Sequence, residues 1–154
     1  MPKTKLTNTD KPYITYRIGL LQSKAYRVMK QRTTQHLSVF DLSPFDWALL
    51  GLLYDSRKGM RVGTIASEIG VEAPFVTSRT RILKQKGIIE EKSDKIDQRA
   101  KILRLSEKGK NFVQKVERDL CLSMKYLVEG GTPKDFATHL RVMNLIIAND
   151  KKKG

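Results

Sequence analysis

The sequence predicts a mainly helical fold that contains one small β-hairpin. Over most of the chain, apolar residues recur three and four positions apart, which is the spacing of one face of an α-helix. Two short alternating runs, "IIEEK" at 88–92 and "KILRLS" at 101–106, are joined by a polar, charged connection typical of a hairpin. Serine, proline and glycine stand where helices are expected to begin and end. The predicted order is three or more helices, a hairpin, and two closing helices.

Length and charge favour one domain with a polyanionic partner. The 154 residues fit one domain, and 30 basic against 16 acidic residues give a net charge of +14. Two blocks in the middle of the chain, 72–87 and 92–104, each carry a net charge of +3, so the excess is more than a charged tail. Nucleic acid is the first expected partner and an anionic membrane surface the second.

Several classes of protein are disfavoured. A single cysteine, Cys121, excludes an intrachain disulfide, and no apolar run approaches the length of a membrane span. The start of the chain lacks the apolar segment of a signal peptide, so we expect a cytoplasmic protein that does not bind membranes. His36 and His139 alone cannot supply the ligands of a zinc site. Because no nucleophile elbow, phosphate-binding glycine loop or HExxH motif is present, we expect neither a cofactor nor an enzyme.

The first two predicted helices differ in burial. Residues 13–37 form an amphipathic pattern whose apolar positions are Ile14, Ile18, Leu21, Ala25, Val28 and Met29. Its cations lie mostly off this stripe and are interpreted as a solvated face, with phosphate contact as the alternative. In the next segment Ser43 is an expected N-cap and Pro44 the first helical residue. The dense apolar run after them, with Trp47 and four leucines, predicts a helix buried on most sides.

The stretch "TIASEIGVEAPFVTSRTRIL" at 64–83 predicts two helices separated by a turn at Gly70. The expected inward set is Ile65, Ile69, Val71, Val76 and Leu83. This is the pattern of a helix-turn-helix, whose second helix enters the DNA major groove. The pattern alone is moderately specific, because any helical hairpin with a glycine turn satisfies part of it.

A charged hairpin directly after the second helix predicts a winged helix-turn-helix. The candidate DNA-binding residues of the helix are Ala73, Pro74, Phe75, Thr77, Ser78 and Arg81, and those of the hairpin are Lys95, Arg99 and Lys101. Such a mixture suits thymine methyls, base edges and phosphates, and arginine suits a narrow minor groove. A solvated helix face is the alternative.

The stretch "DQRAKILRLS" at 97–106 resembles the wing signature of the multiple antibiotic resistance regulator (MarR) family of winged-helix transcription factors. Asp97, Arg99, Leu105 and Ser106 stand at the matching positions. The resemblance implies that Asp97 holds the wing in shape and that Arg99 enters the minor groove. Ser106 is also the expected N-cap of the following helix, which explains why strand gives way to helix so abruptly.

The resemblance covers nearly the whole chain. It implies one MarR-like domain over 1–154, with dimerisation helices at 12–40 and 107–148 and a winged helix-turn-helix DNA-binding region at 43–106. A homodimer is expected, and the apolar stripes at 14–29 and 136–147 fit that role, although a monomeric core would use similar stripes. One departure is that Thr80, with Arg79 beside it, stands where the family usually has a large apolar residue.

The resemblance also suggests a small phenolic or aromatic effector. From their positions, the candidate pocket residues are Tyr13, Tyr16, Arg17 and Trp47. Core or dimer packing is the alternative for each of them. Redox sensing by Cys121 is disfavoured, because the resemblance would place a reactive cysteine near the first helix and Cys121 lies on the fifth.

The sequence leaves three functions open. The leading one is a dimeric, sequence-specific DNA-binding regulator, a repressor that binds a pseudo-palindromic operator and is released by a small ligand. The alternative is a nonspecific or architectural basic DNA-binding protein, which the high charge would permit without base recognition. The third, a winged-helix module that binds proteins, predicts no salt-dependent affinity for DNA.

Overall fold

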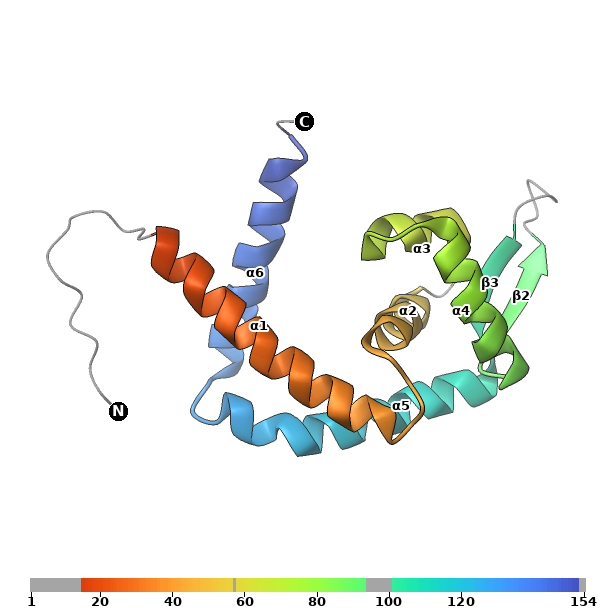
Figure 1. Cartoon of the computed structure of the whole chain (residues 1–154), viewed down its shortest axis with the longest axis horizontal. Helices are drawn as coiled ribbons and strands as arrows, with labels where there is room; N and C mark the ends of the chain where they lie inside the picture. Colours follow the sequence, from red (N-terminus) through yellow and green to blue (C-terminus); the bar gives the residue numbers. More distant parts are fainter. Residues whose placement is uncertain (1–14, 57, 94–100, 153–154) are drawn as a thin grey trace, which may run out of the picture. The chain divides into compact units, whose positions relative to one another are not determined.

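The computed structural model describes residues 15–152 except 57 and 94–100. By their contacts the chain forms two compact units, residues 1–120 and 121–154, and each is described by itself. The first unit contains five helices and a sheet, and Figure 1 shows α4 beside the strands β2 and β3. None of the helices in the described ranges is long and apolar enough to cross a membrane.

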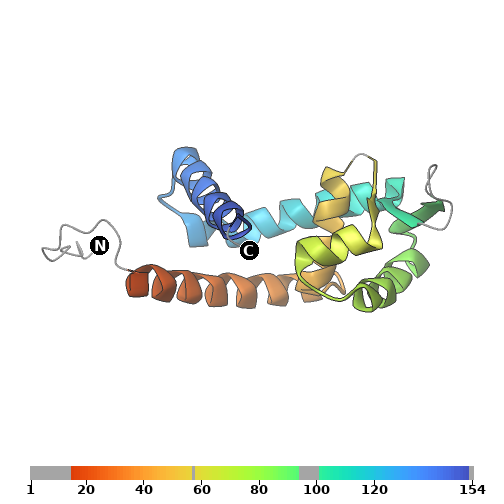
Figure 2. The ribbon, with the colours of Figure 1, turned by 90° about the horizontal axis from the view of Figure 1, so that it is seen from above.

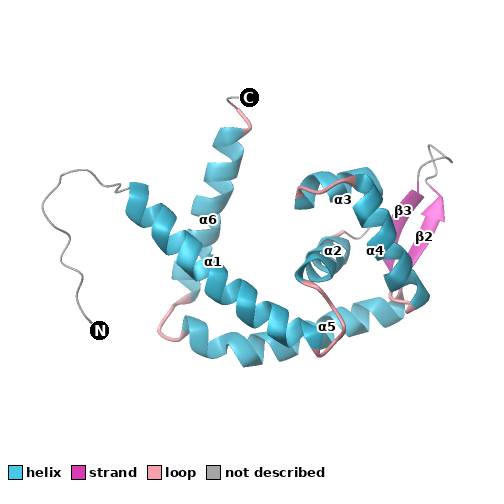
Figure 3. Ribbon diagram, viewed as in Figure 1, coloured by secondary structure: helices cyan, strands magenta, loops and turns pink. Residues whose placement is uncertain are grey.

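The elements follow the predicted order. The helices are α1 Thr15–Ser38, α2 Pro44–Asp55, α3 Val62–Ile69, α4 Ala73–Gln85, α5 Glu107–Met124 and α6 Pro133–Asp150, with a 3₁₀ turn η1 Lys125–Val128. The strands are β1 Met60–Arg61, β2 Ile89–Ser93 and β3 Lys101–Leu105. The prediction of a mainly helical winged helix-turn-helix fold is therefore confirmed (Figure 3).

The sheet has three antiparallel strands in the order β1-β3-β2. The predicted hairpin pairs Ile89 with Leu105 and Ser93 with Lys101. β1 was not predicted, because two residues are too few to show an alternating pattern of their own. It pairs with the middle of β3, where Met60 lies opposite Leu103. The wing thus has a third strand that anchors its base to the segment before α3.

The core of the first unit lies between α2, α3, α4 and the sheet (Figure 2), and the end of α1 and the start of α5 add buried side chains to it. Its apolar side chains are almost fully buried and include Leu37, Leu49, Leu50, Leu53, Ile65, Val76, Leu83, Leu103, Val113 and Val116. The expectation that α2 is buried on most sides is confirmed by its three buried leucines, whereas Trp47 is half-buried. Burial of these side chains supplies the main favourable term in folding.

The helix-turn-helix forms as predicted. α3 ends at Gly70, whose φ of +76° lies in the left-handed region that glycine adopts at little cost. The amide groups of Gly70 and Val71 both donate to the carbonyl oxygen of Ala66, which closes the helix. α4 begins at Ala73, three positions after Gly70, with Pro74 in its first turn. The short turn fixes the direction of α4 relative to α3.

Ser106 joins the wing to α5. Its hydroxyl oxygen accepts from the Gly109 amide at 2.9 Å, so the predicted N-cap is confirmed. The same hydroxyl donates to the carbonyl oxygen of Gly87 at 2.6 Å, at the turn that ends α4. A Cβ on Gly109 would lie 2.1 Å from the carbonyl oxygen of Ile88, so only glycine permits this approach. The end of α4 and the start of α5 are thereby held together.

The second unit consists of the end of α5, η1 and α6. α6 begins with a capping box: the Thr132 hydroxyl accepts from the Asp135 amide, and the Asp135 carboxylate accepts from the Thr132 amide. α6 has no buried residue among those described. The apolar stripe predicted along it is exposed, with Phe136, Leu140 and Ile147 exposing 42%, 62% and 55% of their surface.

Candidate nucleic-acid interface

α4 is held by an inner face of Val76, Thr80 and Leu83, all of them buried. Their spacing of four and three residues puts them on one side of the helix. The Thr80 hydroxyl donates to the Thr77 carbonyl oxygen at 3.0 Å, so this polar group is satisfied within the helix. Thr80 is therefore buried at a position where a large apolar residue was expected. The face of α4 predicted to point inward does so.

One flank of α4 carries cations that bind acidic groups of the same unit. The Arg79 guanidinium donates from two nitrogens to the Asp46 carboxylate, at 3.0 and 2.5 Å, and this carboxylate is fully buried. Lys86 forms an ion pair with Asp41 in the turn between α1 and α2. Two of the four basic residues in the block 72–87 are therefore used to attach α4 to α2 and the turn before it.

Asp46 stays ionised despite its burial. Burial opposes the charged form, but hydrogen bonds from Arg79 and Ser43, with the positive charge of Arg79, outweigh it and hold the pKa of Asp46 below its usual range. Both the amide and the hydroxyl of Ser43 donate to this carboxylate. Asp46 thus joins the first turn of α2 to the middle of α4. The sequence carries no sign of the pairing between Asp46 and Arg79, which lie 33 positions apart.

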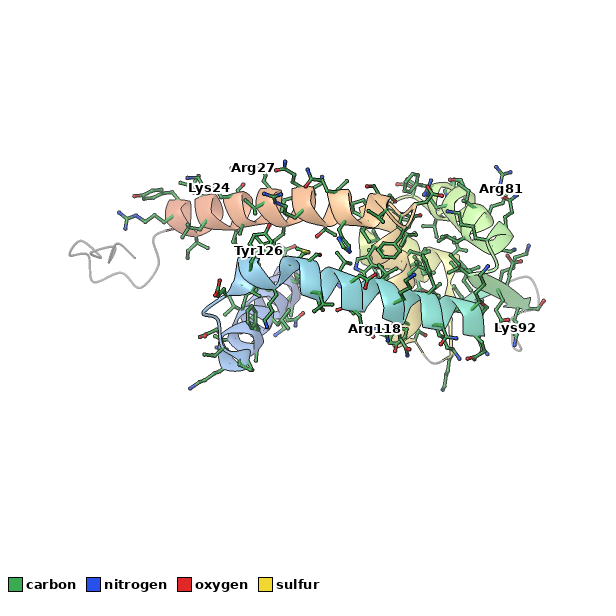
Figure 4. The ribbon with its side chains drawn as sticks, turned by 90° about the horizontal axis from the view of Figure 1, so that it is seen from below. Lys24, Arg27, Arg81, Lys92, Arg118 and Tyr126 are labelled. Atoms are coloured by element: carbon green, nitrogen blue, oxygen red, sulfur yellow. The ribbon has the colours of Figure 1, made fainter. Side chains whose placement is uncertain are left out.

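The other flank of α4 lines a groove of about 660 Å³ against the wing. α4 contributes Ala73, Pro74, Thr77, Ser78, Thr80, Arg81 and Lys84, and the strands contribute Glu91 and Lys101. Six of the predicted DNA-binding residues are therefore brought together: Ala73, Pro74, Thr77, Ser78, Arg81 and Lys101. All of them except Ala73 are exposed. Arg81 points away from the rest of the unit (Figure 4).

Phe75, another predicted DNA-binding residue, does not line this groove and is 46% exposed. Its ring packs edge-on against Phe45 of α2, with the ring centroids 4.7 Å apart. The contact holds one face of an apolar side chain rigidly while the rest of it faces outward. Such a group can meet a thymine methyl, the apolar feature of the major groove.

Two hydroxyl groups give the groove its polar character. The Thr77 hydroxyl donates to the Ala73 carbonyl oxygen at 3.1 Å, and the Ser78 hydroxyl donates to the Phe75 carbonyl oxygen at 3.0 Å. Each oxygen keeps lone pairs that can accept from a base amino group, and each hydroxyl can also turn to donate to a base. The arrangement supports hydrogen bonding to base edges, with Arg81 able to contact a base or a phosphate.

The remaining predicted site residues are placed as follows. Lys95, Asp97 and Arg99 at the wing tip, and Tyr13, lie outside the described residues. Tyr16 and Arg17 contact each other on α1, where Arg17 Nε donates to the Tyr16 hydroxyl at 3.1 Å. Neither belongs to the pocket that Trp47 lines.

Trp47 lines a pocket of about 730 Å³ between α2 and α5. Gly51, Tyr54, Val113 and Arg118 also contribute to its wall. The structure thus separates Trp47 from the Tyr16–Arg17 pair among the candidate effector residues.

One residue of the groove, Glu91, was not predicted. It forms ion pairs with Lys84 of α4 at 2.6 Å and with Lys101 of β3 at 2.8 Å. On β2, Glu91 is two residues after the buried Ile89, so both side chains lie on the same face of the sheet. In the structure Glu91 also lies opposite the buried Leu103 of β3. The alternation along β2 was the only sequence signal for its orientation. From the sequence alone, Glu91 is no more than one residue of a charged hairpin.

Comparison with known proteins agrees with this geometry. Residues 42–101 match the model of the MarR family. The DNA complex of MepR from S. aureus is 21% identical with a TM-score of 0.65, covering 90% of this chain and 99% of that one. The repressor CouR bound to a 23-mer DNA duplex is 19% identical with a TM-score of 0.70, covering 92% and 99%.

A second CouR structure, from Rhodococcus jostii RHA1, contains p-coumaroyl-CoA. It is 17% identical with a TM-score of 0.73, and the match covers 90% of this chain and 96% of that one. These likenesses show a shared fold, and the family model covers the helix-turn-helix and most of the wing. Over residues 42–101 the chain thus matches the MarR family, and its fold is the one found in the DNA-bound proteins MepR and CouR.

Proposed function

We propose that the chain is a dimeric, sequence-specific repressor that binds a pseudo-palindromic DNA operator in the cytoplasm and blocks access to the promoter. The DNA-binding region is 43–106, and 12–40 with 107–148 form the dimer. The observation that carries the proposal is the groove in which α4 presents hydroxyl, apolar and cationic groups beside the wing. Two proteins of the same fold, MepR and CouR, are known as DNA complexes.

Within this proposal, α4 enters the major groove with its N-terminal half. Pro74, Phe75, Thr77 and Ser78 face base edges and thymine methyls, and Arg81 with Lys101 contacts the backbone or bases. At the wing tip, Lys95 and Arg99 reach the neighbouring minor groove, and Asp97 keeps the wing in shape. Base contacts supply the sequence preference, and the cations supply most of the affinity.

The dimer is supported by apolar surface that the described chain leaves open. On α1, Ile18, Leu21 and Val28 are exposed, and on α6 the stripe described above is exposed. A soluble monomer rarely exposes contiguous apolar patches of this kind, which mark interfaces between proteins. A symmetric pair also suits a DNA site whose half-sites are related by two-fold symmetry.

For the effector, we propose a small aromatic or phenolic compound in the pocket between α2 and α5. The Trp47 and Tyr54 rings offer aromatic surface, and Arg118 offers a positive group for a carboxylate. CouR, which shares the fold, binds an aromatic acyl-CoA. Because α2 is bound to α4 through Asp46 and Arg79, a ligand that shifts α2 would also shift the DNA-binding helix.

The proposal is tested by the salt dependence of DNA binding. A duplex enriched from a random-sequence pool by the wild-type protein is compared with a scrambled duplex of the same composition, by fluorescence anisotropy. We expect a preference of ~10³ or more at physiological salt. Equal affinity for both duplexes, falling together as salt rises, would instead identify the nonspecific DNA-binding protein that the charge of +14 permits.

Arg81→Ala is expected to weaken binding to the enriched duplex by about 1–3 kcal/mol, because it removes one base or phosphate contact. Lys115→Ala is the control, since Lys115 is also an exposed basic residue of the first unit but lies on α5, away from the groove. Both variants lose one positive charge. Equal losses of affinity in the two variants would remove Arg81 from the interface.

A further inference from the structure

Glu91 places a negative charge inside the groove that is proposed to face DNA. One carboxylate oxygen, Oε2, lies 2.6 Å from Lys84 Nζ, and the other, Oε1, lies 2.8 Å from Lys101 Nζ. The carboxylate therefore joins a cation of α4 to a cation of β3. All three residues line the groove with Arg81.

Stability is a weak reason for this arrangement. Lys84 exposes 39% of its side chain and Lys101 exposes 66%, and exposed ion pairs contribute little to folding. The strands are already joined by the β2–β3 ladder over five residue pairs. Hydrogen bonds from Lys101 and Lys84 hold the pKa of Glu91 below its usual range, so the carboxylate is ionised at neutral pH.

A carboxylate at this place costs affinity for DNA in general. Phosphates repel it, and it neutralises part of the positive charge that attracts any duplex. In return, it fixes two long and otherwise mobile lysine side chains at set positions. A duplex that presents phosphates at those positions binds to ordered cations, whereas a duplex in another register does not.

We propose that Glu91 is a specificity-determining positioning residue, which holds Lys84 and Lys101 in one arrangement and suppresses binding to unrelated DNA. The inference rests on the proposed function, because it concerns the preference of a DNA-binding protein. Such a residue matters in this chain because a net charge of +14 would otherwise promote binding to any polyanion, whatever its sequence.

The neighbouring Glu90 provides a matched control. Successive side chains of a strand point to opposite faces of the sheet. Glu90 accordingly pairs with Lys92 at 3.3 Å and lines a different pocket, with Arg104 and the start of α5. Replacing Glu90 or Glu91 with glutamine changes the net charge equally, but only Glu91→Gln alters the groove.

The experiment measures the affinity of wild type, Glu91→Gln and Glu90→Gln for the enriched and the scrambled duplex. For Glu91→Gln we expect affinity for the scrambled duplex to rise about five- to tenfold, as for one added phosphate contact at moderate salt. Affinity for the enriched duplex should rise less or fall, so the ratio of the two affinities drops about fivefold. Glu90→Gln should keep the ratio within about twofold of wild type.

Two results would overturn the inference while leaving the proposed function intact: an unchanged ratio in Glu91→Gln, or the same change in both variants. Glu91→Asp keeps the charge on a side chain one methylene shorter and should lower the ratio in the same direction, because it cannot hold both lysines. A wild-type ratio in Glu91→Asp would also overturn it. A wild-type protein with no preference between the duplexes would instead overturn the proposed function, and the inference with it.

Discussion

Asp46→Ala is expected to lower the free energy of unfolding of the first unit by about 3 kcal/mol. The substitution removes the capping box of α2, which contributes about 1 kcal/mol, and one partner of a buried ion pair, which costs more. Arg79 exposes 30% of its side chain and can recover part of its hydration, so the loss stays below that of a fully buried pair. Urea unfolding at a fixed protein concentration, followed by circular dichroism, measures the effect.

The chain offers a matched control for this substitution. Asp135 makes the same capping box with Thr132, in the same Ser/Thr-Pro-x-Asp order, at the start of α6. No ion pair to Asp135 is found among the described residues, and the residue is exposed. Asp135→Ala should therefore cause a much smaller loss. Equal losses in the two variants would mean that the pair between Asp46 and Arg79 adds nothing to the cap.

The dependence of the free energy of unfolding on pH, below about pH 4, gives a second measure of the pair between Asp46 and Arg79. The pKa of Asp46 is lowered in the folded protein, so its contribution is fully present above the unfolded pKa of about 3.9. The contribution is lost as the pH falls through the folded pKa. Asp46→Asn removes this titration and should flatten the dependence on pH below about 4. The pKa values of Asp41, Glu91 and Asp135 are also lowered in the folded protein. The Asp46→Asn protein should therefore still lose some stability as the pH falls below about 4.

The structural features that depend on residues close together in the sequence could be predicted. Ser43 with Pro44, Gly70 and Ser106 mark helix ends through groups that act within a few residues of themselves, and the structure confirms each one. The inner face of α4 was also predictable from helical spacing. Because the inner face of α4 is buried, the residues on its other faces point outward. Six of the predicted DNA-binding residues consequently line one groove.

Features that depend on distant residues were not predictable. Arg79 and Asp46 are separated by 33 positions and Lys86 and Asp41 by 45, and a charge count cannot tell a cation paired inside the protein from one that faces outward. β1 has two residues and becomes a strand only because β3 lies beside it. Glu91 was missed for a related reason, since its two lysine partners lie on two other elements, α4 and β3, which only the fold brings together.

Leu140→Glu is expected to convert the proposed dimer to a monomer and to weaken binding to the enriched duplex by about 100-fold or more. Leu140 lies on the exposed apolar stripe of α6, and in a symmetric interface the substitution places two carboxylates in apolar surroundings. An unpaired buried charge costs far more than one apolar contact contributes. Each released monomer then binds a single half-site and loses the gain from joining two sites.

Thr138→Glu provides the control for this experiment, because Thr138 is exposed on the face of α6 opposite the stripe. It adds the same charge to the same helix and should leave both the dimer and its DNA affinity close to wild type. Analytical ultracentrifugation measures the assembly and fluorescence anisotropy the affinity. A Leu140→Glu protein that stays dimeric would move the interface away from α6, whereas a monomer with unchanged affinity would mean that one half-site suffices. Only loss of both together links the apolar stripe to operator recognition.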